Sequence, residues 1–98
     1  MISITQNDDA VSVTGHAGYA ELGKDIVCAG VTALVQGLVE SIRQLTQDMP
    51  EWHMSSGEFQ LNTENLSKES LFLISSFFIA VQLIADEFPG HVQIRRGS

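Results

Sequence analysis

The sequence is short of cysteine and of basic residues, and both shortages restrict what the protein can be. One cysteine among 98 residues excludes a disulfide framework within the chain and fits a reducing compartment. Five Lys and Arg residues against twelve Asp and Glu residues give a formal charge of −7. Because phosphate binding needs clustered basic side chains, we expect no direct nucleic acid partner.

Long apolar runs are also missing. The most apolar stretch, Leu71–Ala85, is interrupted by serine and glutamine and is shorter than the roughly 20 residues that span a bilayer. Residues 1–10 have neither the positive region nor the apolar core of a signal peptide. We therefore expect a cytoplasmic protein with no membrane partner. The acidic surface either favours encounter with a basic peptide or only keeps a small protein soluble.

The sequence lacks the usual patterns of metal and nucleotide sites. Its histidines and its cysteine do not occur as paired ligands at short spacing, so we expect no metal ion. Gly15, Gly18 and Gly23 do not have the spacing of a phosphate-binding or dinucleotide-binding loop, so we expect no organic cofactor.

The chain is long enough for one domain, residues 1–98, with 44% hydrophobic residues to form a modest core. Alternating apolar residues predict strands at 1–6, 10–14, 51–54, 58–61 and 91–96. Helical spacing of apolar residues predicts helices at about 25–46 and 67–88. The expected fold is α+β, in the order β-β-α-β-β-α-β, with two long helices packed on one mixed or antiparallel sheet.

Each predicted element has an apolar face that should be buried. The expected faces are Val27, Val31, Leu34, Val35, Leu38, Ile42 and Leu45 on the first helix, and Trp52, Met54, Phe59 and Leu61 on the central strands. The second helix has two apolar stripes, with Leu71, Ile74, Phe78, Val81 and Ala85 on one and Leu73, Phe77, Ile84 and Phe88 on the other. Such wide coverage exceeds what one sheet needs, so we expect a homodimer. Pro50 should stop the first helix, which we expect to end near Met49.

The only cysteine, Cys28, should lie in the first turn of the first helix, after a glycine-rich loop that starts at His16. Unpaired N–H groups and the helix dipole at such a position favour a thiolate, which is a nucleophile. A histidine brought back by the loop is the usual base and then acid. The alternative is that Cys28 is a small buried residue and His16 an ordinary loop residue.

Asp25 has two possible roles. It is a favoured N-cap residue, and the backbone N–H of Cys28 would be the natural donor to it. It could instead orient His16 as the acidic member of a triad. A carboxylate so close opposes ionisation of the thiol unless His16 is protonated, which favours the capping role.

The residues around Cys28 leave two further alternatives open. The loop at 17–24, with Gly18, Tyr19 and Gly23, either closes over a bound peptide or is an ordinary mobile loop. The small residues Ala29 and Gly30 either let a peptide carbonyl approach free N–H groups that form an oxyanion hole, or allow close helix packing.

The segments Gly15-His16-Ala17, Gly23 and Asp25-Ile26-Val27-Cys28-Ala29 resemble the signature of the YsxB-like family of ribosomal-processing cysteine proteases. The resemblance implies a cytoplasmic endopeptidase that removes a short N-terminal extension from a large-subunit ribosomal protein, number twenty-seven. It implies that His16 and Cys28 are the catalytic pair and that Asp25 occupies an acidic family position. Thr32 stands where the family often has serine, which keeps a hydroxyl and adds a methyl group.

Two other functions are compatible with the same residues. One is a non-enzymatic module that binds a ribosomal protein tail, with Cys28 buried. The other is a thiol redox sensor, for which an exposed, ionised cysteine would suffice.

Overall fold

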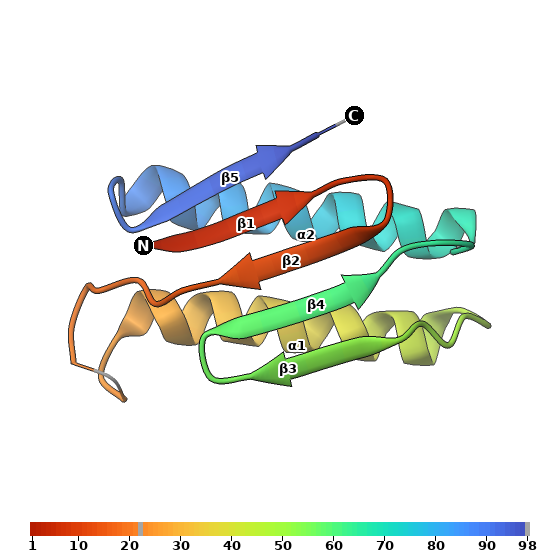
Figure 1. The fold of residues 1–98 in the computed structure, drawn as a ribbon, viewed down its shortest axis with the longest axis horizontal. Helices are drawn as coiled ribbons and strands as arrows, with labels where there is room; N and C mark the ends of the chain where they lie inside the picture. The colour runs from red at the N-terminus through yellow and green to blue at the C-terminus, as the bar shows by residue number, and fades with distance from the viewer. Residues whose placement is uncertain (22, 98) are drawn as a thin grey trace.

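The computed structural model describes residues 1–21 and 23–97 and has five strands in one sheet with two helices against it (Figure 1). The strands are β1 (Ile2–Gln6), β2 (Ala10–Thr14), β3 (Trp52–Ser55), β4 (Glu58–Asn62) and β5 (Val92–Arg96), and the helices are α1 (Ile26–Leu45) and α2 (Lys68–Glu87). This confirms the predicted α+β class and element order, and each element ends within one residue of its predicted bounds.

The sheet is mixed and has the strand order β3-β4-β2-β1-β5. Only β1 and β5 pair in parallel, and the other three pairs are antiparallel. The connections β2-α1-β3 and β4-α2-β5 each join two strands of the same direction, but they run toward opposite edges of the sheet. Since β2 and β4 also point in opposite directions, right-handed crossovers place both helices on the same face. Figure 1 shows both helices behind the sheet.

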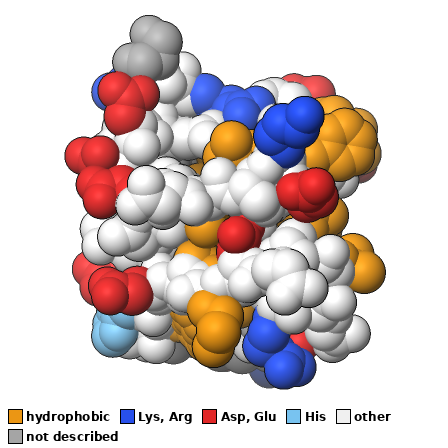
Figure 2. Space-filling view, turned by 90° about the vertical axis from the view of Figure 1, so that its right-hand side faces the viewer, with side chains coloured by type: hydrophobic (Ala, Val, Ile, Leu, Met, Phe, Trp, Pro, Cys, Tyr) orange, Lys and Arg blue, Asp and Glu red, His pale blue; other side chains and the backbone are white. Residues whose placement is uncertain are grey.

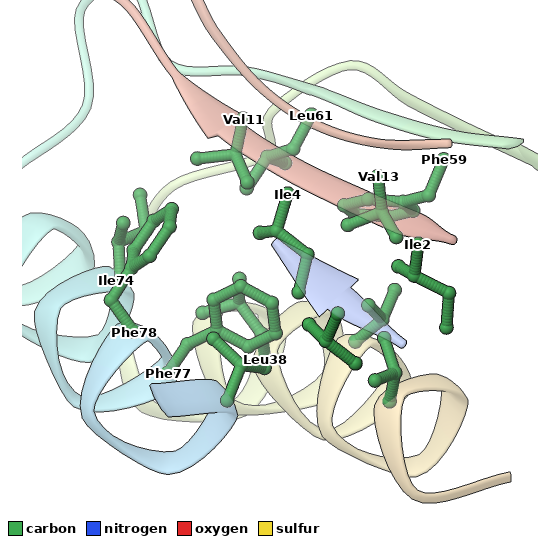
Figure 3. Close-up of a cluster of buried hydrophobic side chains, with 14 of the residues drawn as sticks. Ile2, Ile4, Val11, Val13, Leu38, Phe59, Leu61, Ile74, Phe77 and Phe78 are labelled. Carbon is green, nitrogen blue, oxygen red and sulfur yellow. The ribbon is translucent and has the colours of Figure 1, made fainter. Parts of the chain in front are cut away.

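The core lies between the sheet and this helix layer. Figure 3 shows the strand side chains Ile2, Ile4, Val11, Val13, Phe59 and Leu61 opposite side chains of the helices. The helices contribute buried residues at helical spacing, which are Val27, Val31, Val35, Leu38 and Ile42 from α1 and Ile74, Phe77, Phe78 and Val81 from α2. The opposite face of the sheet is polar, as the alternating pattern predicts for a two-layer fold.

Three residues expected on apolar faces are exposed. Trp52 is 52% exposed because it begins β3, an edge strand. Leu45 is the last residue of α1, and Leu71 lies in the first turn of α2, where the helix extends past the end of β4 (Figure 1). The expectation that these side chains would be buried was wrong because a periodic pattern does not say where the partner layer ends.

Side chains define the helix ends. Asp25 caps α1, and Ser67 caps α2 by accepting a hydrogen bond from the Ser70 N–H. At the other end of α1, both the N–H and the hydroxyl of Thr46 donate to the Ile42 carbonyl. The backbone of Thr46 is extended, with φ −130° and ψ 172°, so the helix ends at Leu45, before Met49, where it was expected to end.

By length and composition, α1 and α2 each satisfy the criteria for a membrane-spanning helix. The run Leu71–Ala85 is only part of α2, which has 20 residues. Core helices of soluble proteins satisfy the same criteria. Both helices bury one face against the sheet, which fits that reading.

Candidate active site

His16 and Cys28 line one cavity, with a volume of about 380 Å³. His16 lies just after the end of β2, and Cys28 lies in the first turn of α1. The cavity has an apolar floor and a polar rim, lined by Ile2, Val13, Gly15, Val31, Thr32, Val35, Met54, Ser55, Ser56, Gly57, Glu58 and Phe59. The structure thus brings together a candidate nucleophile, a candidate base and space for a substrate.

The imidazole of His16 lies against the turn between β3 and β4. A Cβ atom at Gly57 would be only 2.8 Å from His16 Nε2, so the ring occupies the space that a side chain at this position would need. The Gly15 N–H donates to the Gly57 carbonyl at 2.9 Å, which ties the end of β2 to the same turn. The side chain of His16 is exposed to solvent on its other side.

The sulfur of Cys28 is half-buried and accepts a hydrogen bond from the Ala17 N–H at 3.2 Å. This hydrogen bond fixes the position of the sulfur at the start of α1. No hydrogen bond joins the His16 ring to this sulfur among the described residues. Catalytic hydrogen bonds of this kind often form only once substrate is bound.

Asp25 is a buried carboxylate, only 5% exposed, that accepts four backbone hydrogen bonds. One oxygen accepts from Val27 and Cys28 at 3.0 Å, and the other accepts from Tyr19 at 2.9 Å and from Ala20 at 3.2 Å. Burial raises the pKa of Asp25, but the four backbone donors outweigh burial and hold the pKa below its ordinary value. Asp25 therefore caps α1 and at the same time clamps the glycine-rich loop onto the helix.

This geometry supports the capping role over the triad role. Both oxygens of Asp25 are taken by backbone N–H groups, and no hydrogen bond joins Asp25 to the ring of His16 in the described part of the chain. The four donors stabilise the charged form of Asp25 in this position.

The expected free N–H groups beside Cys28 are not free in this structure. The N–H groups of Val27 and Cys28 donate to the Asp25 side chain, and that of Ala29 donates to the Asp25 carbonyl at 3.0 Å. Gly30 serves helix packing, since a Cβ atom there would lie 3.3 Å from Ile84 of α2. An oxyanion hole in this turn would need some of these hydrogen bonds to be exchanged.

The other predicted site residues divide into two groups. Gly15 and Thr32 line the cavity with the candidate pair. Ala29 is exposed and lies outside the cavity lining, as do Gly18 and Gly23, which both have positive φ. Tyr19 also lies outside it and packs edge-on against Phe88 and His91. Residue 22 of the predicted loop lies outside the described residues.

Sequence reasoning missed two features of the site. It gave no role to Ser55-Ser56-Gly57, which lies between the strands predicted at 51–54 and 58–61, but pairing of β4 with β2 brings this turn beside His16. It also gave no role to His91, whose Nδ1 lies 2.9 Å from the Ala17 carbonyl oxygen. The glycine at position 57 was a local signal for a turn, whereas nothing in the local sequence connects His91 with Ala17.

Within residues 1–21 and 23–97, no three His, Cys, Asp or Glu side chains come together as a possible metal site. The chemistry that His16 and Cys28 support in the shared cavity is nucleophilic attack by sulfur with a nearby imidazole.

Comparisons with known proteins agree with this geometry. Residues 1–93 match the family model described as cysteine protease Prp. A ribosomal processing cysteine protease Prp from Staphylococcus aureus is 29% identical over 100 residues, which cover 95% of this chain and 94% of that protein.

Two solved structures of the S. aureus protease have the same fold. One holds a covalently linked product peptide and matches with a TM-score of 0.86 at 28% identity, covering 98% of this chain and 97% of the other. The second holds a substrate peptide and matches with a TM-score of 0.80 at 27% identity, with the same coverage of both chains.

Proposed function

The chain belongs to the cysteine protease Prp family, and we propose that it removes the N-terminal extension of a large-subunit ribosomal protein, number twenty-seven, during ribosome assembly. Membership of the family makes the chain a cysteine-type peptidase. The proposed substrate is supported by the relatives' name, ribosomal processing cysteine protease, and by the peptides bound to the S. aureus protein.

The observation that carries the proposal is the single cavity shared by His16 and Cys28. In the proposed reaction, the sulfur of Cys28 attacks the scissile carbonyl carbon while His16 takes the thiol proton. The resulting intermediate collapses to a thioester, and His16 returns the proton to the departing amine. Water, deprotonated by His16, then hydrolyses the thioester and regenerates the thiol.

The cavity also suits a peptide. Its floor is formed by apolar side chains of both layers, including Val31 and Phe59, and its rim carries hydroxyl groups of Thr32, Ser55 and Ser56. An apolar floor with a few polar groups at the rim is typical of sites that bind a side chain in a fixed orientation. The net charge of −7 favours the approach of a basic ribosomal protein.

Cleavage of the extended ribosomal protein tests the proposal. We expect the wild-type chain to release the extension, Cys28→Ala to abolish release, and His16→Ala to slow it by about 100-fold or more, the usual contribution of a general base. Arg43→Ala is a suitable control, because Arg43 is exposed near the far end of α1 and pairs only with Glu40. Cleavage that survives Cys28→Ala would contradict the proposal.

The same variants separate the protease from its rivals. If the protein only binds the tail, the wild type would bind the extended ribosomal protein without cutting it, just as the variants would. A redox sensor would oxidise at Cys28 but show no Cys28-dependent cleavage.

We also propose that the protein works in the cytoplasm as a homodimer. The single cysteine fits a reducing compartment. Large apolar side chains, which are Leu45, Met49, Phe72, Ile79 and Leu83, remain exposed on and beside the helices. Figure 2 shows apolar side chains among charged ones at the end of the molecule where α1 ends and α2 begins. Sedimentation that shows only monomer at micromolar concentration would contradict the dimer.

A further inference from the structure

The start of the glycine-rich loop is attached not only to α1 but also to the junction of α2 and β5. His91 Nδ1 lies 2.9 Å from the Ala17 carbonyl oxygen. The ring of Tyr19 packs edge-on against His91, with 5.4 Å between ring centroids, and against Phe88, with 5.1 Å. His91, Phe88 and Tyr19 do not line the cavity, so this attachment lies outside the proposed catalytic groups.

His91 is itself firmly held. Its N–H donates to the Phe88 carbonyl at 3.1 Å, and its carbonyl accepts from the Ile2 N–H at 2.9 Å. Its backbone therefore connects the end of α2 to the first strand. Since the Ala17 carbonyl oxygen can only accept a hydrogen bond, Nδ1 of His91 must carry the proton in this contact.

Ala17 is consequently fixed at both of its polar groups. His91 holds its carbonyl, and its N–H points at the sulfur of Cys28 at 3.2 Å. Its side chain is only 2% exposed, so packing also restrains it. The two groups belong to neighbouring peptide planes that meet at the Ala17 Cα, so holding both planes restricts φ and ψ of Ala17 and with them the direction of its N–H.

We propose that His91 is a positioning residue for the nucleophile. By holding the Ala17 carbonyl, it keeps the Ala17 N–H aimed at the Cys28 sulfur, so that the sulfur is held in position to attack the substrate. The same anchor fixes the backbone next to His16. The role in catalysis rests on the proposed protease function, but the effect on the sulfur does not depend on any substrate.

Two substitutions separate the hydrogen bond from mere packing. His91→Phe keeps an aromatic ring for the edge contact with Tyr19 and removes the donor. His91→Asn loses the ring but places an amide N–H close to the position of Nδ1, so it can restore the hydrogen bond to Ala17. A residue that only fills space would be replaced better by phenylalanine, and a residue that donates would be replaced better by asparagine.

The experiment measures two rates for each folded variant, the alkylation of Cys28 by iodoacetamide at neutral pH and the cleavage of an extended ribosomal protein. We expect His91→Phe to slow alkylation about tenfold and to lower kcat by a similar factor with a smaller change in KM, as loss of a hydrogen bond to a charged group implies. We expect His91→Asn to recover most of both rates. His53→Asn is the matched control, since His53 is exposed on β3 and, in the described part of the chain, pairs only with Glu58.

The proposal is overturned if His91→Phe alkylates at the wild-type rate, or if His91→Asn is impaired as much as His91→Phe. Thermal unfolding of both variants confirms that they are folded before the rates are compared. If the proposed protease function is wrong, the wild type will not cleave the extended ribosomal protein at all. The alkylation rates of Cys28 would still report on the role of His91.

Discussion

At the scale of single residues, the site depends on a glycine as much as on its reactive groups. Gly57 has φ +74° and leaves room for the His16 ring, which lies 2.8 Å from where a Cβ atom would be. A side chain there would be strained in the backbone and would push the imidazole away. The position of His16 is therefore set by a residue 41 positions further along the chain.

We predict that Gly57→Ala loses about 1–2 kcal/mol of stability from the left-handed backbone. We expect kcat to fall about 100-fold, because the displaced imidazole no longer meets the thiol. Urea unfolding and cleavage assays measure the two effects. Gly90→Ala supplies the reference for backbone strain alone, since Gly90 has φ +88° and open space around its Cβ position. Wild-type cleavage by Gly57→Ala would show that His16 does not need its contact with the turn.

At the scale of secondary structure elements, hydrogen-bonded carboxylates join helix ends to loops, one of them the half-buried Asp48. Asp48 lies after α1 and accepts hydrogen bonds from the Ser67 N–H at 2.9 Å, from the Ser67 hydroxyl at 2.6 Å and from the Ser70 hydroxyl. The hydroxyl donors, with the Ser67 N–H, outweigh burial and hold the pKa of Asp48 below its ordinary value near 3.8. Asp48 thus holds the start of α2 through hydrogen bonds, as Asp25 holds the start of α1.

These lowered pKa values predict a loss of stability in acid. A carboxylate whose pKa is lower in the folded state contributes stability above its ordinary pKa and loses it as the pH falls toward the folded value. We expect the free energy of unfolding to decrease below about pH 4, where Asp25 and Asp48 must take up protons. In urea titrations, the stability difference between wild type and Asp48→Asn should be largest at neutral pH and should narrow in acid. Parallel pH profiles for the two proteins would contradict this origin.

At the scale of the whole molecule, one layer of helices protects one face of the sheet, and the helices expose the rest of their apolar surface. Ile74 and Ile79 lie on the same helix, α2, but Ile74 is fully buried and Ile79 is 70% exposed. The two positions therefore separate the core from the surface that we assign to the dimer.

We predict that Ile74→Ala destabilises the fold by about 2–5 kcal/mol, because it leaves a cavity between α2 and the sheet. We expect Ile79→Ala to change the stability of the monomer by no more than about 0.5 kcal/mol. Chemical unfolding at low protein concentration measures both. If Ile79→Ala instead loses much stability, and the loss depends on protein concentration, the exposed face is already buried in a dimer.

The sequence by itself was sufficient for everything that depends on neighbours along the chain. Apolar residues that recur at helical spacing from Val27 to Ile42 and from Ile74 to Val81 identified the helices. Alternation of apolar and polar residues in Ala10–Thr14 identified a strand. Asp25 was recognised as a cap because capping involves donors only two or three residues away. The pairing of His16 with Cys28 came from their spacing and from the family resemblance.

Only the tertiary structure decided which distant segments meet. The strand order β3-β4-β2-β1-β5 brings Gly57 to His16, and the position of β5 beside β1 brings His91 to Ala17. The same arrangement left Trp52 exposed at the edge of the sheet. These contacts follow from strand pairing and crossover direction, which depend on the total burial of the folded chain and leave no mark in the local sequence pattern.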